Sequence, residues 1–334
     1  MSRVTYLVKR IFGMNTRQMF LKIKEVKAKS GKSSVGIFFD MLYCGLKYQA
    51  GYMDYALFEM YNLNASQRKT VVTRGINNSF IKRFNNPEFT VIFEDKRKFN
   101  ASFSDFLHRD WVDVENSSDE DLELFIKKHP LFMAKPFDGM CGKGIEKISI
   151  GDFSSLSEIK SYLFENKLML LEEVVAQHPV MSELHPNSVN TCRVITLLKD
   201  GQANVVATYL RIGNGKYVDN FNSGGMVVPV DEESGEVFYP AINKKSELFE
   251  VHPLTNVSIK GFKMPLWQEV LDLAKNAAKV VPQVGLIGWD VAITENGPLI
   301  IEGNDFPGHD IYGLPAHRTN GIGVLPKFEK ILNS

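Results

Sequence analysis

The sequence lacks any long stretch without a charged side chain. The longest one runs only from Asn220 to Val230, whereas a membrane-spanning helix needs about 20 largely apolar residues. We therefore expect no such helix in this chain. The first residues also predict no signal peptide, because Arg3, Lys9 and Arg10 interrupt their apolar side chains.

Cysteine is scarce as well. The chain of 334 residues has 3 cysteines, and this odd number is not typical of a disulfide framework. We expect a reducing, cytoplasmic location. Hydrophobic residues make up 44% and charged residues 23%, both near the globular average, which excludes a disordered or collagen-like chain. At roughly 150 residues per domain, the length predicts about two domains.

The net charge is zero, with 39 basic and 39 acidic residues, but the two signs are unevenly distributed. Residues 1–34 hold nine Lys and Arg and a single acid, Glu25. A basic, partly apolar helix can bind an anionic membrane, so one interpretation of this arm is peripheral contact with the inner face of a membrane. The other is a solvated helix face that covers the body of the protein. Nucleic-acid binding is not expected, because the rest of the chain is acidic.

The order of predicted elements indicates an α+β fold with a helical N-terminal region. Residues 1–88 carry apolar side chains at helical spacing. Residues 89–130 are expected to be a connecting segment that opens with a short strand, Phe89–Phe93. Residues 131–175 are interpreted as a small subdomain of strands and one helix, and residues 176–334 as a C-terminal subdomain that includes a β-hairpin.

A glycine-rich loop follows a predicted strand that ends at Lys135. Backbone N–H groups near Gly139, Gly142 and Gly144 can form an anion-binding nest, and the loop also holds Lys143. The loop does not match the Walker pattern, and no helix follows it directly. A flap that closes over phosphates is the functional interpretation, and an ordinary hairpin turn is the other.

The predicted C-terminal hairpin carries three side chains with oxygen donors. Glu302 and Asn304 are two residues apart on one strand, so they face the same side of it. A tight Asn-Gly turn would place Asp290 opposite Gly303, whereas the three-residue loop Glu295-Asn296-Gly297 places Asp290 opposite Glu302. With the second register the three side chains converge and predict a site for Mg²⁺, with Mn²⁺ as an alternative ion. Solvated acids at strand ends are the other interpretation, although a buried carboxylate pair is costly without a cation.

A polar and basic set lies between these two features in the sequence. Arg193 and Arg211 belong to successive predicted strands. Two arginines near a metal site can bind a carboxylate or a phosphate, and surface salt bridges are the alternative. The loop that follows holds Asn220, Asn222, Ser223 and Gly224.

Taken in order, these features resemble the ATP-grasp superfamily over about residues 90–330. The residues that carry the resemblance are Met133-Ala134-Lys135-Pro136 through Gly144-Ile145, Gly288-Trp289-Asp290 and Glu302-Gly303-Asn304. The strand at residues 191–193 and the loop at 220–225 are similar to ribosomal-protein glutamate ligases. More narrowly, Gln177-His178-Pro179 together with residues 188–193 looks like the sugar-transfer-associated branch, which is implicated in bacterial capsule and exopolysaccharide assembly.

The resemblance implies a fold in which two α+β subdomains grip ATP, with the metal bound at Asp290, Glu302 and Asn304. Lys96, Lys135 and the glycine loop would contact the phosphates. Glu173 and Val174 would form the hinge whose backbone contacts the adenine, and Glu172, Val175 and Gln177 are also expected to bind the nucleotide. An acid that commonly binds the ribose in related ligases has no clear counterpart after this hinge.

The remaining positions implied by the resemblance concern the reaction itself. Arg193, Arg211 and Asn220 would hold the phosphates and the acyl-phosphate intermediate. Substrate contacts are expected from Asn222, Ser223, Gly224, His309 and Asp310.

The implied activity is that of an ATP-dependent, ADP-forming carboxylate–amine ligase. Its substrate would be a small molecule or glycan precursor with a carboxylate and an amine, and the product an amide on a capsule or exopolysaccharide sugar. Two alternatives remain open: an ATP-grasp kinase that phosphorylates a hydroxyl of a sugar-like substrate, and a non-catalytic nucleotide-binding scaffold of a polysaccharide assembly complex.

Overall fold

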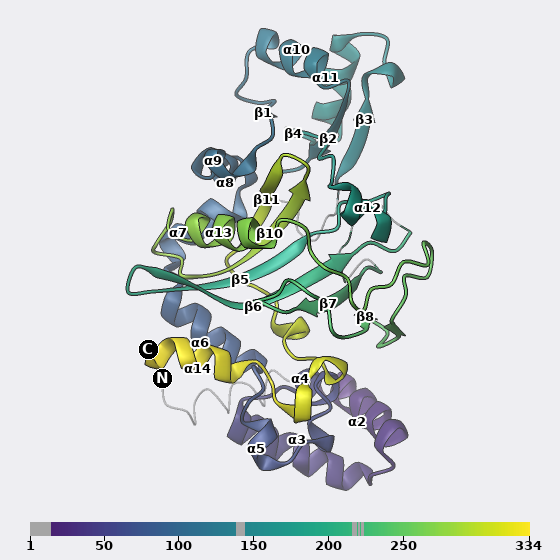
Figure 1. The fold of residues 1–334 in the computed structure, drawn as a ribbon, viewed down its shortest axis with the longest axis vertical. Helices are drawn as coiled ribbons and strands as arrows, with labels where there is room; N and C mark the ends of the chain where they lie inside the picture. Colours follow the sequence, from purple (N-terminus) through teal and green to yellow (C-terminus); the bar gives the residue numbers. More distant parts are fainter. Residues whose placement is uncertain (1–14, 138–143, 216–218, 220, 222–223) are drawn as a thin grey trace. The chain divides into compact units, whose positions relative to one another are not determined.

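The computed structural model describes residues 15–137, 144–215, 219, 221 and 224–334 (Figure 1). The chain divides into two compact units: unit 1 comprises Met1–Arg83 and Gly308–Ser334, and unit 2 comprises Phe84–Pro307. The predicted boundary at residue 88 lies near the change from unit 1 to unit 2. The last 27 residues, 308–334, group with the N-terminal helices, whereas the sequence had suggested one C-terminal subdomain from residue 176 onward.

Unit 1 is helical. Helix α2 (Thr16–Ser30) begins where the side chain of Asn15 accepts a hydrogen bond from the Gln18 N–H, and it ends at Gly31, whose φ of 69° is left-handed. Helix α3 (Ser34–Tyr48) follows and packs against α2. The other elements of unit 1 are α4 (Tyr52–Leu57), η1 (Met60–Asn62), α5 (Ala65–Arg68), α6 (Arg74–Phe84), η4 (His309–Ile311), η5 (Pro315–His317), η6 (Thr319–Gly321) and α14 (Leu325–Asn333).

Unit 2 opens with three short helices: α7 (Pro87–Glu94), α8 (Lys96–Ser102) and α9 (Ser104–Leu107). The strand predicted at Phe89–Phe93 is therefore wrong, because this segment lies within α7. The side chain of Asn86 caps the helix by accepting a hydrogen bond from the Glu88 N–H at 3.1 Å, and Pro87 occupies the first helical position. Asn followed by Pro and an acid is a helix-start pattern, and here it outweighs the β-propensity of the aromatic residues.

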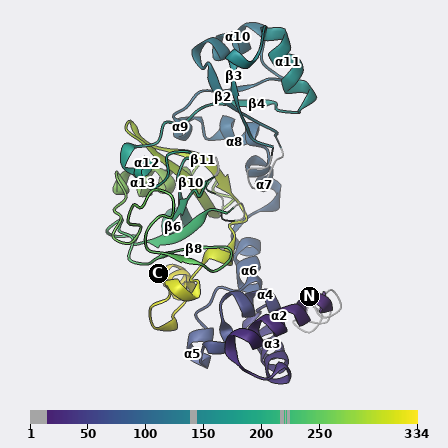
Figure 2. The ribbon, with the colours of Figure 1, turned by 90° about the vertical axis from the view of Figure 1, so that its right-hand side faces the viewer.

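A four-stranded antiparallel sheet with the strand order β1-β4-β2-β3 forms the smaller part of unit 2. Helices α10 and α11 cover it, and their apolar side chains share one core with the strands (Figures 1 and 2). The predicted strand Leu131–Lys135 is confirmed as β2. The other elements are β1 (Trp111–Asp113), α10 (Asp119–Lys128), β3 (Glu146–Ser149), η2 (Ile150–Asp152), α11 (Leu156–Glu165) and β4 (Leu170–Glu173).

A seven-stranded antiparallel sheet with the order β11-β10-β5-β6-β7-β8-β9 forms the larger part. Helix α13 (Trp267–Ala277) buries Val270, Leu271 and Ala274 in the core of this sheet. The α+β class predicted from the sequence is confirmed. The remaining elements are α12 (Pro179–Leu184), β5 (Cys192–Lys199), β6 (Gln202–Ile212), β7 (Met226–Val230), β8 (Ala241–Asn243), β9 (Leu248–Phe249), β10 (Leu286–Thr294) and β11 (Gly297–Asn304).

None of the helices in the described ranges combines the length and the hydropathy that a membrane span requires.

An aromatic cluster from α7 and α8 packs under the hairpin of β10 and β11. The rings of Phe93 and Phe99 lie 6.0 Å apart between centroids, and Phe93 also contacts Trp289 at 6.2 Å. A Cβ atom at Gly303 would lie 2.9 Å from Phe99, 3.0 Å from Trp289 and 3.1 Å from Phe93. Only glycine therefore allows the aromatic rings to approach this strand, and the side chains before and after it point to the opposite face.

We predict that Gly303→Ala destabilises the protein, because the added methyl group overpacks the aromatic cluster. The expected loss is about 1–3 kcal/mol in the free energy of unfolding, measured by urea denaturation. Gly151→Ala is the control, since its Cβ would meet only the Ser149 hydroxyl at 3.5 Å. Equal stability of the two variants would contradict this account of the packing.

Candidate active site

The hairpin of β10 and β11 places Asp290 opposite Glu302, as predicted. The predicted three-residue loop is not what produces this pairing. The turn is shorter, because Thr294 pairs with Gly297 rather than with Pro298. A β-bulge then shifts the register, so that Val291 pairs with Ile300 and Ile301 is the extra residue. The bulge compensates for the shorter turn and restores the predicted pairing.

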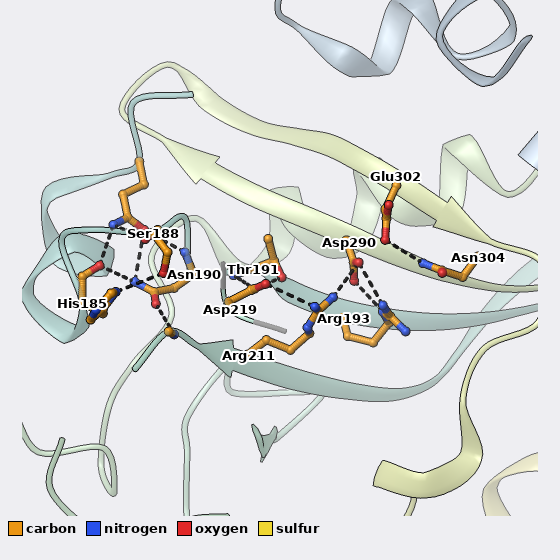
Figure 3. A network of polar contacts seen from close by, with 12 residues as sticks. His185, Ser188, Asn190, Thr191, Arg193, Arg211, Asp219, Asp290, Glu302 and Asn304 are labelled. Carbon is orange, nitrogen blue, oxygen red and sulfur yellow. Dashed lines mark hydrogen bonds and ion pairs between the residues drawn. The ribbon is translucent and has the colours of Figure 1, made fainter. Parts of the chain in front are cut away.

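Three predicted metal-binding side chains meet on one side of this hairpin (Figure 3). Glu302 lies directly opposite Asp290 in the pairing of the two strands. The side-chain amide of Asn304 donates to the Gly288 carbonyl at 3.3 Å and lies 3.5 Å from Glu302 Oε1. The hairpin geometry thus gathers two carboxylates and an amide oxygen, a donor set that a hard divalent cation prefers.

Arg193 and Arg211 bind the Asp290 carboxylate from neighbouring strands (Figure 3). Arg193 lies directly opposite Asp290 in the pairing of β5 with β10, and its Nε and Nη2 donate to the two carboxylate oxygens at 2.5 and 2.9 Å. Arg211, on β6, donates from Nη1 to Asp290 Oδ2 at 2.6 Å. The two predicted arginines are therefore brought to the predicted metal-binding hairpin.

Asp219 is a member of this network that the sequence analysis missed. Its carboxylate accepts hydrogen bonds from the backbone N–H of Thr191 at 3.0 Å and from the Thr191 hydroxyl, and it forms an ion pair with Arg211 at 3.2 Å. The sequence offered one indication, an aspartate directly before the Asn220 loop. Its hydrogen bonds with Thr191, 28 residues earlier, were not evident without the fold.

The network contains three carboxylates and two guanidinium groups. Burial opposes the ionised form of Asp290, but the charges of Arg193 and Arg211 outweigh it and hold its pKa well below the usual range. Burial raises the pKa of Asp219 despite the nearby Arg211. Glu302 reaches solvent, but surrounding protein atoms reduce its hydration, and together with the charge of Asp290 they raise its pKa.

This charge balance fits a bound cation. If all three carboxylates of the network are ionised, negative charge exceeds positive charge by one, so binding of a divalent cation would favour their ionised forms. Glu302 and Asn304 supply oxygen donors, and Asp290 supplies charge while it orients the two arginines. The residues present thus fit Mg²⁺ or Mn²⁺.

A second charged cluster is buried between the two sheets of unit 2. Glu172 on β4 forms ion pairs with Lys135 on β2 at 2.5 Å and with Arg109 at 3.1 Å. Asn100 donates to the same carboxylate at 3.1 Å. Burial opposes ionisation of Glu172, but the charges of Arg109 and Lys135 outweigh it and lower its pKa strongly. Lys135 is thus held in place by Glu172.

Arg109 connects this cluster to the hairpin. Its Nη1 donates to the Ile300 carbonyl at 2.5 Å and its Nη2 to the Ile301 carbonyl at 3.1 Å. These carbonyls belong to the bulge that sets Glu302 opposite Asp290. Arg109 was not among the predicted site residues, because it belongs to no sequence motif.

Lys96 is the first residue of α8, rather than part of a segment that follows a strand. Its Nζ lies 3.4 Å from the carbonyl oxygen of Phe137, at the start of the glycine-rich loop. The ring of Phe137 also stacks on Arg97, whose guanidinium carbon lies 3.7 Å from the ring centroid. The predicted phosphate lysine is therefore placed beside the last described residue before the glycine-rich loop.

The predicted hinge and the nucleotide-binding residues beside it begin at the last two residues of β4 and continue beyond the strand. Glu173 accepts a hydrogen bond from the Asp110 N–H at 3.1 Å, and Val174 and Val175 are half-buried. The side-chain amide of Gln177 donates to the carbonyls of His185 and Ser188 and accepts two hydrogen bonds from Asn190. All four bonds of this amide stay within the protein, so its side chain stabilises the chain segment between the hinge and β5.

Several predicted positions fall outside the described residues: Gly139, Gly142, Lys143, Asn220, Asn222 and Ser223. Gly144 and Gly224 are described, and both have positive φ angles, of 72° and 103°.

Two predicted substrate residues, His309 and Asp310, belong to unit 1. Within that unit, His309 Nε2 pairs with the buried carboxylate of Asp54 at 2.9 Å. The hairpin predicted to bind the metal belongs to unit 2, so the predicted substrate roles of His309 and Asp310 stay predictions.

The profile of one protein family, described as sugar-transfer associated ATP-grasp, matches residues 75–331. The chain belongs to this family. The ATP-grasp fold expected from the sequence is thereby confirmed. No curated protein matches the chain. The residues that precede the family match include α2, α3, α4 and α5.

A comparison with solved structures finds several enzymes with low sequence identity. The ligase PsnB, complexed with a minimal precursor, is 14% identical with a TM-score of 0.44, over 75% of this chain and 63% of PsnB. D-alanyl-alanine synthetase A from Vibrio cholerae is 13% identical with a TM-score of 0.43, over 74% and 62% of the two chains. The L-amino acid ligase from Bacillus licheniformis is 10% identical with a TM-score of 0.40, over 64% and 41%. This chain thus spans less than two thirds of each of these proteins.

We predict that Glu172→Ala lowers the free energy of unfolding by about 3–5 kcal/mol at neutral pH, because it leaves Arg109 and Lys135 without their buried counter-ion. The control is Glu123→Ala, which removes an exposed pair with Lys127 and should cost about 0–1 kcal/mol. Urea denaturation of both variants measures the difference.

The cost of Glu172→Ala should also depend on pH. The pKa of Glu172 is lower in the folded state, so its stabilisation is fully present above the unfolded-state pKa of about 4.3 and is lost as the pH falls through the lowered folded value. The stability difference between wild type and variant should therefore shrink below about pH 4. A difference that stays constant across this range would contradict the ion-pair account.

Arg109→Lys tests whether Arg109 positions the hairpin. Lysine keeps the charge but cannot hold Glu172 and both bulge carbonyls at once. We expect Mn²⁺ affinity, measured by electron paramagnetic resonance, to fall about tenfold, as for other residues that orient metal ligands. Arg68→Lys is the control, since it removes a two-point contact with Asp40 in unit 1. An unchanged Mn²⁺ affinity in Arg109→Lys would show that Arg109 does not position the metal-binding residues.

Proposed function

We propose that this protein is an ATP-dependent, ADP-forming carboxylate–amine ligase that acts in sugar transfer. The observation that carries the proposal is the convergence of Asp290, Glu302 and Asn304 with Arg193 and Arg211 on four adjacent strands. Membership of the sugar-transfer-associated ATP-grasp family supports it.

The proposed reaction has two steps. An oxygen of the substrate carboxylate forms a bond to the γ-phosphorus of ATP while the bond from that phosphorus to the leaving ADP oxygen breaks. A neutral amine then adds to the carbonyl carbon of the acyl phosphate, the amine loses a proton, and inorganic phosphate leaves as the amide forms. A divalent cation supplies charge neutralisation for the transferred phosphoryl group.

The side chains of the site match these demands. The contacts with Asp290 use two of the five N–H groups of Arg193, so the others are available for an anionic substrate. Arg211 is fixed between Asp290 and Asp219, which holds its guanidinium rigidly beside the hairpin. Such preorganised donors stabilise the negative charge that develops on phosphoryl and tetrahedral oxygens.

Lys135 is expected to bind phosphate. Glu172 holds its ammonium group at 2.5 Å, and an ammonium has three N–H donors, so this contact leaves capacity for an anion. The companion predictions, that Lys96 contacts phosphate and that the Glu173–Val175 segment lies beside the adenine, belong to the same proposal.

We place the substrate among glycan precursors. The family description links this chain to sugar transfer, and the proposed product is an amide that joins a sugar-acid or amino-acid carboxylate to an amine of a capsule or exopolysaccharide precursor. A cytoplasmic location fits a reaction that consumes ATP.

The test combines a chemical trap with a matched pair of variants. Incubation with ATP, Mg²⁺, hydroxylamine and candidate uronic or amino acids should yield a hydroxamate and ADP, because hydroxylamine captures an acyl phosphate. Glu302→Gln should lower the rate at least about 100-fold through loss of a metal-binding carboxylate, whereas Glu295→Gln, at the exposed turn of the same hairpin, should retain wild-type activity.

Other outcomes separate the alternatives. A phosphorylated sugar without any hydroxamate would establish a kinase instead. Binding of ATP without turnover in the presence of candidate substrates, unaffected by Glu302→Gln, would favour a nucleotide-binding scaffold and contradict the proposed metal site.

A further inference from the structure

Helix α3 has apolar side chains on both of its faces. Ile37, Met41 and Cys44 form its buried face. On the opposite face lie Val35, Phe39, Tyr43 and Leu46, which are 66%, 64%, 44% and 60% exposed. We call these four residues the α3 stripe.

The α3 stripe departs from the usual pattern of a surface helix, which presents polar residues to water. Its members recur at intervals of three or four residues and so form one continuous line along the helix. Contiguous exposed apolar surface of this kind marks an interaction site more often than isolated apolar residues do.

The charge of the same helix pair indicates what the stripe contacts. Residues 15–48 carry seven Lys and Arg against the two acids Glu25 and Asp40, and Asp40 is already paired with Arg68. Arg17, Lys24 and Lys27 are exposed on α2, which packs against α3. A helix pair that exposes both an apolar stripe and cationic groups is complementary to a lipid surface with anionic headgroups.

Two further features agree with a membrane surface. Lys47 donates from Nζ to the Tyr43 hydroxyl at 2.6 Å and lies 5.1 Å from the centre of its ring. Tyrosine and lysine are amphipathic side chains that favour the headgroup level, with their apolar parts toward the lipid tails. Helix α2 also exposes Phe20 and Leu21, by 56% and 49%.

We propose that α2 and α3 form a peripheral docking surface for an anionic lipid bilayer. The α3 stripe inserts at the boundary between headgroups and acyl chains, and Arg17, Lys24 and Lys27 bind anionic headgroups. This surface differs from the basic arm considered in the sequence, because the apolar side chains of α3 contribute to it. It is also independent of the reaction proposed for unit 2.

Flotation of the full chain with lipid vesicles tests the proposal. Wild type should bind vesicles made of equal parts phosphatidylcholine and phosphatidylglycerol, and bind pure phosphatidylcholine weakly. The double variant Phe39→Ser/Leu46→Ser should reduce the partition coefficient about tenfold or more. Both residues are exposed, so the thermal unfolding of the variant should match wild type.

A second pair of variants separates charge from apolar contact. Lys24→Gln/Lys27→Gln should weaken binding to the anionic vesicles about tenfold and leave binding to phosphatidylcholine unchanged. Matched controls in unit 2 are Leu124→Ser/Phe164→Ser, exposed by 66% and 53%, and Lys260→Gln/Lys279→Gln, also exposed. Both controls should bind as wild type does.

Three results would overturn the proposal. One is the absence of wild-type binding to the anionic vesicles. Another is equal binding of wild type and Phe39→Ser/Leu46→Ser. The third is a dimer in sedimentation velocity that the same double variant converts to a monomer, since a second copy of the chain would then cover the stripe.

Discussion

The candidate site depends on one buried interaction, the contact of Glu172 with Arg109 and Lys135. The cluster lies where the small sheet meets the hairpin of the large one, because Glu172 belongs to β4 and Arg109 binds the carbonyls of Ile300 and Ile301. A carboxylate in such surroundings is stable only while both cations remain in place. This cluster therefore positions Lys135 and the bulge of the hairpin that is proposed to bind the metal.

The second constraint is the charge of the network around Asp290. Both of its arginines contact carboxylates, and burial raises the pKa values of Glu302 and Asp219. In the proposed function a bound divalent cation would favour the ionised forms of these carboxylates. The Glu172 cluster differs, because its counter-ions Arg109 and Lys135 belong to the chain itself.

Much of this site was predictable from the sequence, because its residues follow local rules. The two-residue period of a strand placed Glu302 and Asn304 on one face, and Lys135 stood at the end of a recognisable strand. The rest depended on contacts between distant segments. Arg109 and Asp219 lie in no motif, and they matter only because the fold brings them to Glu172 and Arg211. The helix at Phe89–Phe93 was missed because aromatic residues favour strands, while the capping residues Asn86 and Pro87 decide for a helix.

The position of the α3 stripe along the chain bears on its meaning. The family match begins at residue 75, so α2 and α3 precede the part that the family shares. The fold and the site of unit 2 belong within the matched part and do not require an apolar face on α3. Exposed Val35, Phe39 and Leu46 lower solubility without adding to the core of unit 1, because Ile37, Met41 and Cys44 already form the buried face. An exposed apolar surface that is unfavourable in water and does not contribute to folding is best explained by contact with a lipid bilayer. The cations of α2 indicate that the headgroups of this bilayer are anionic.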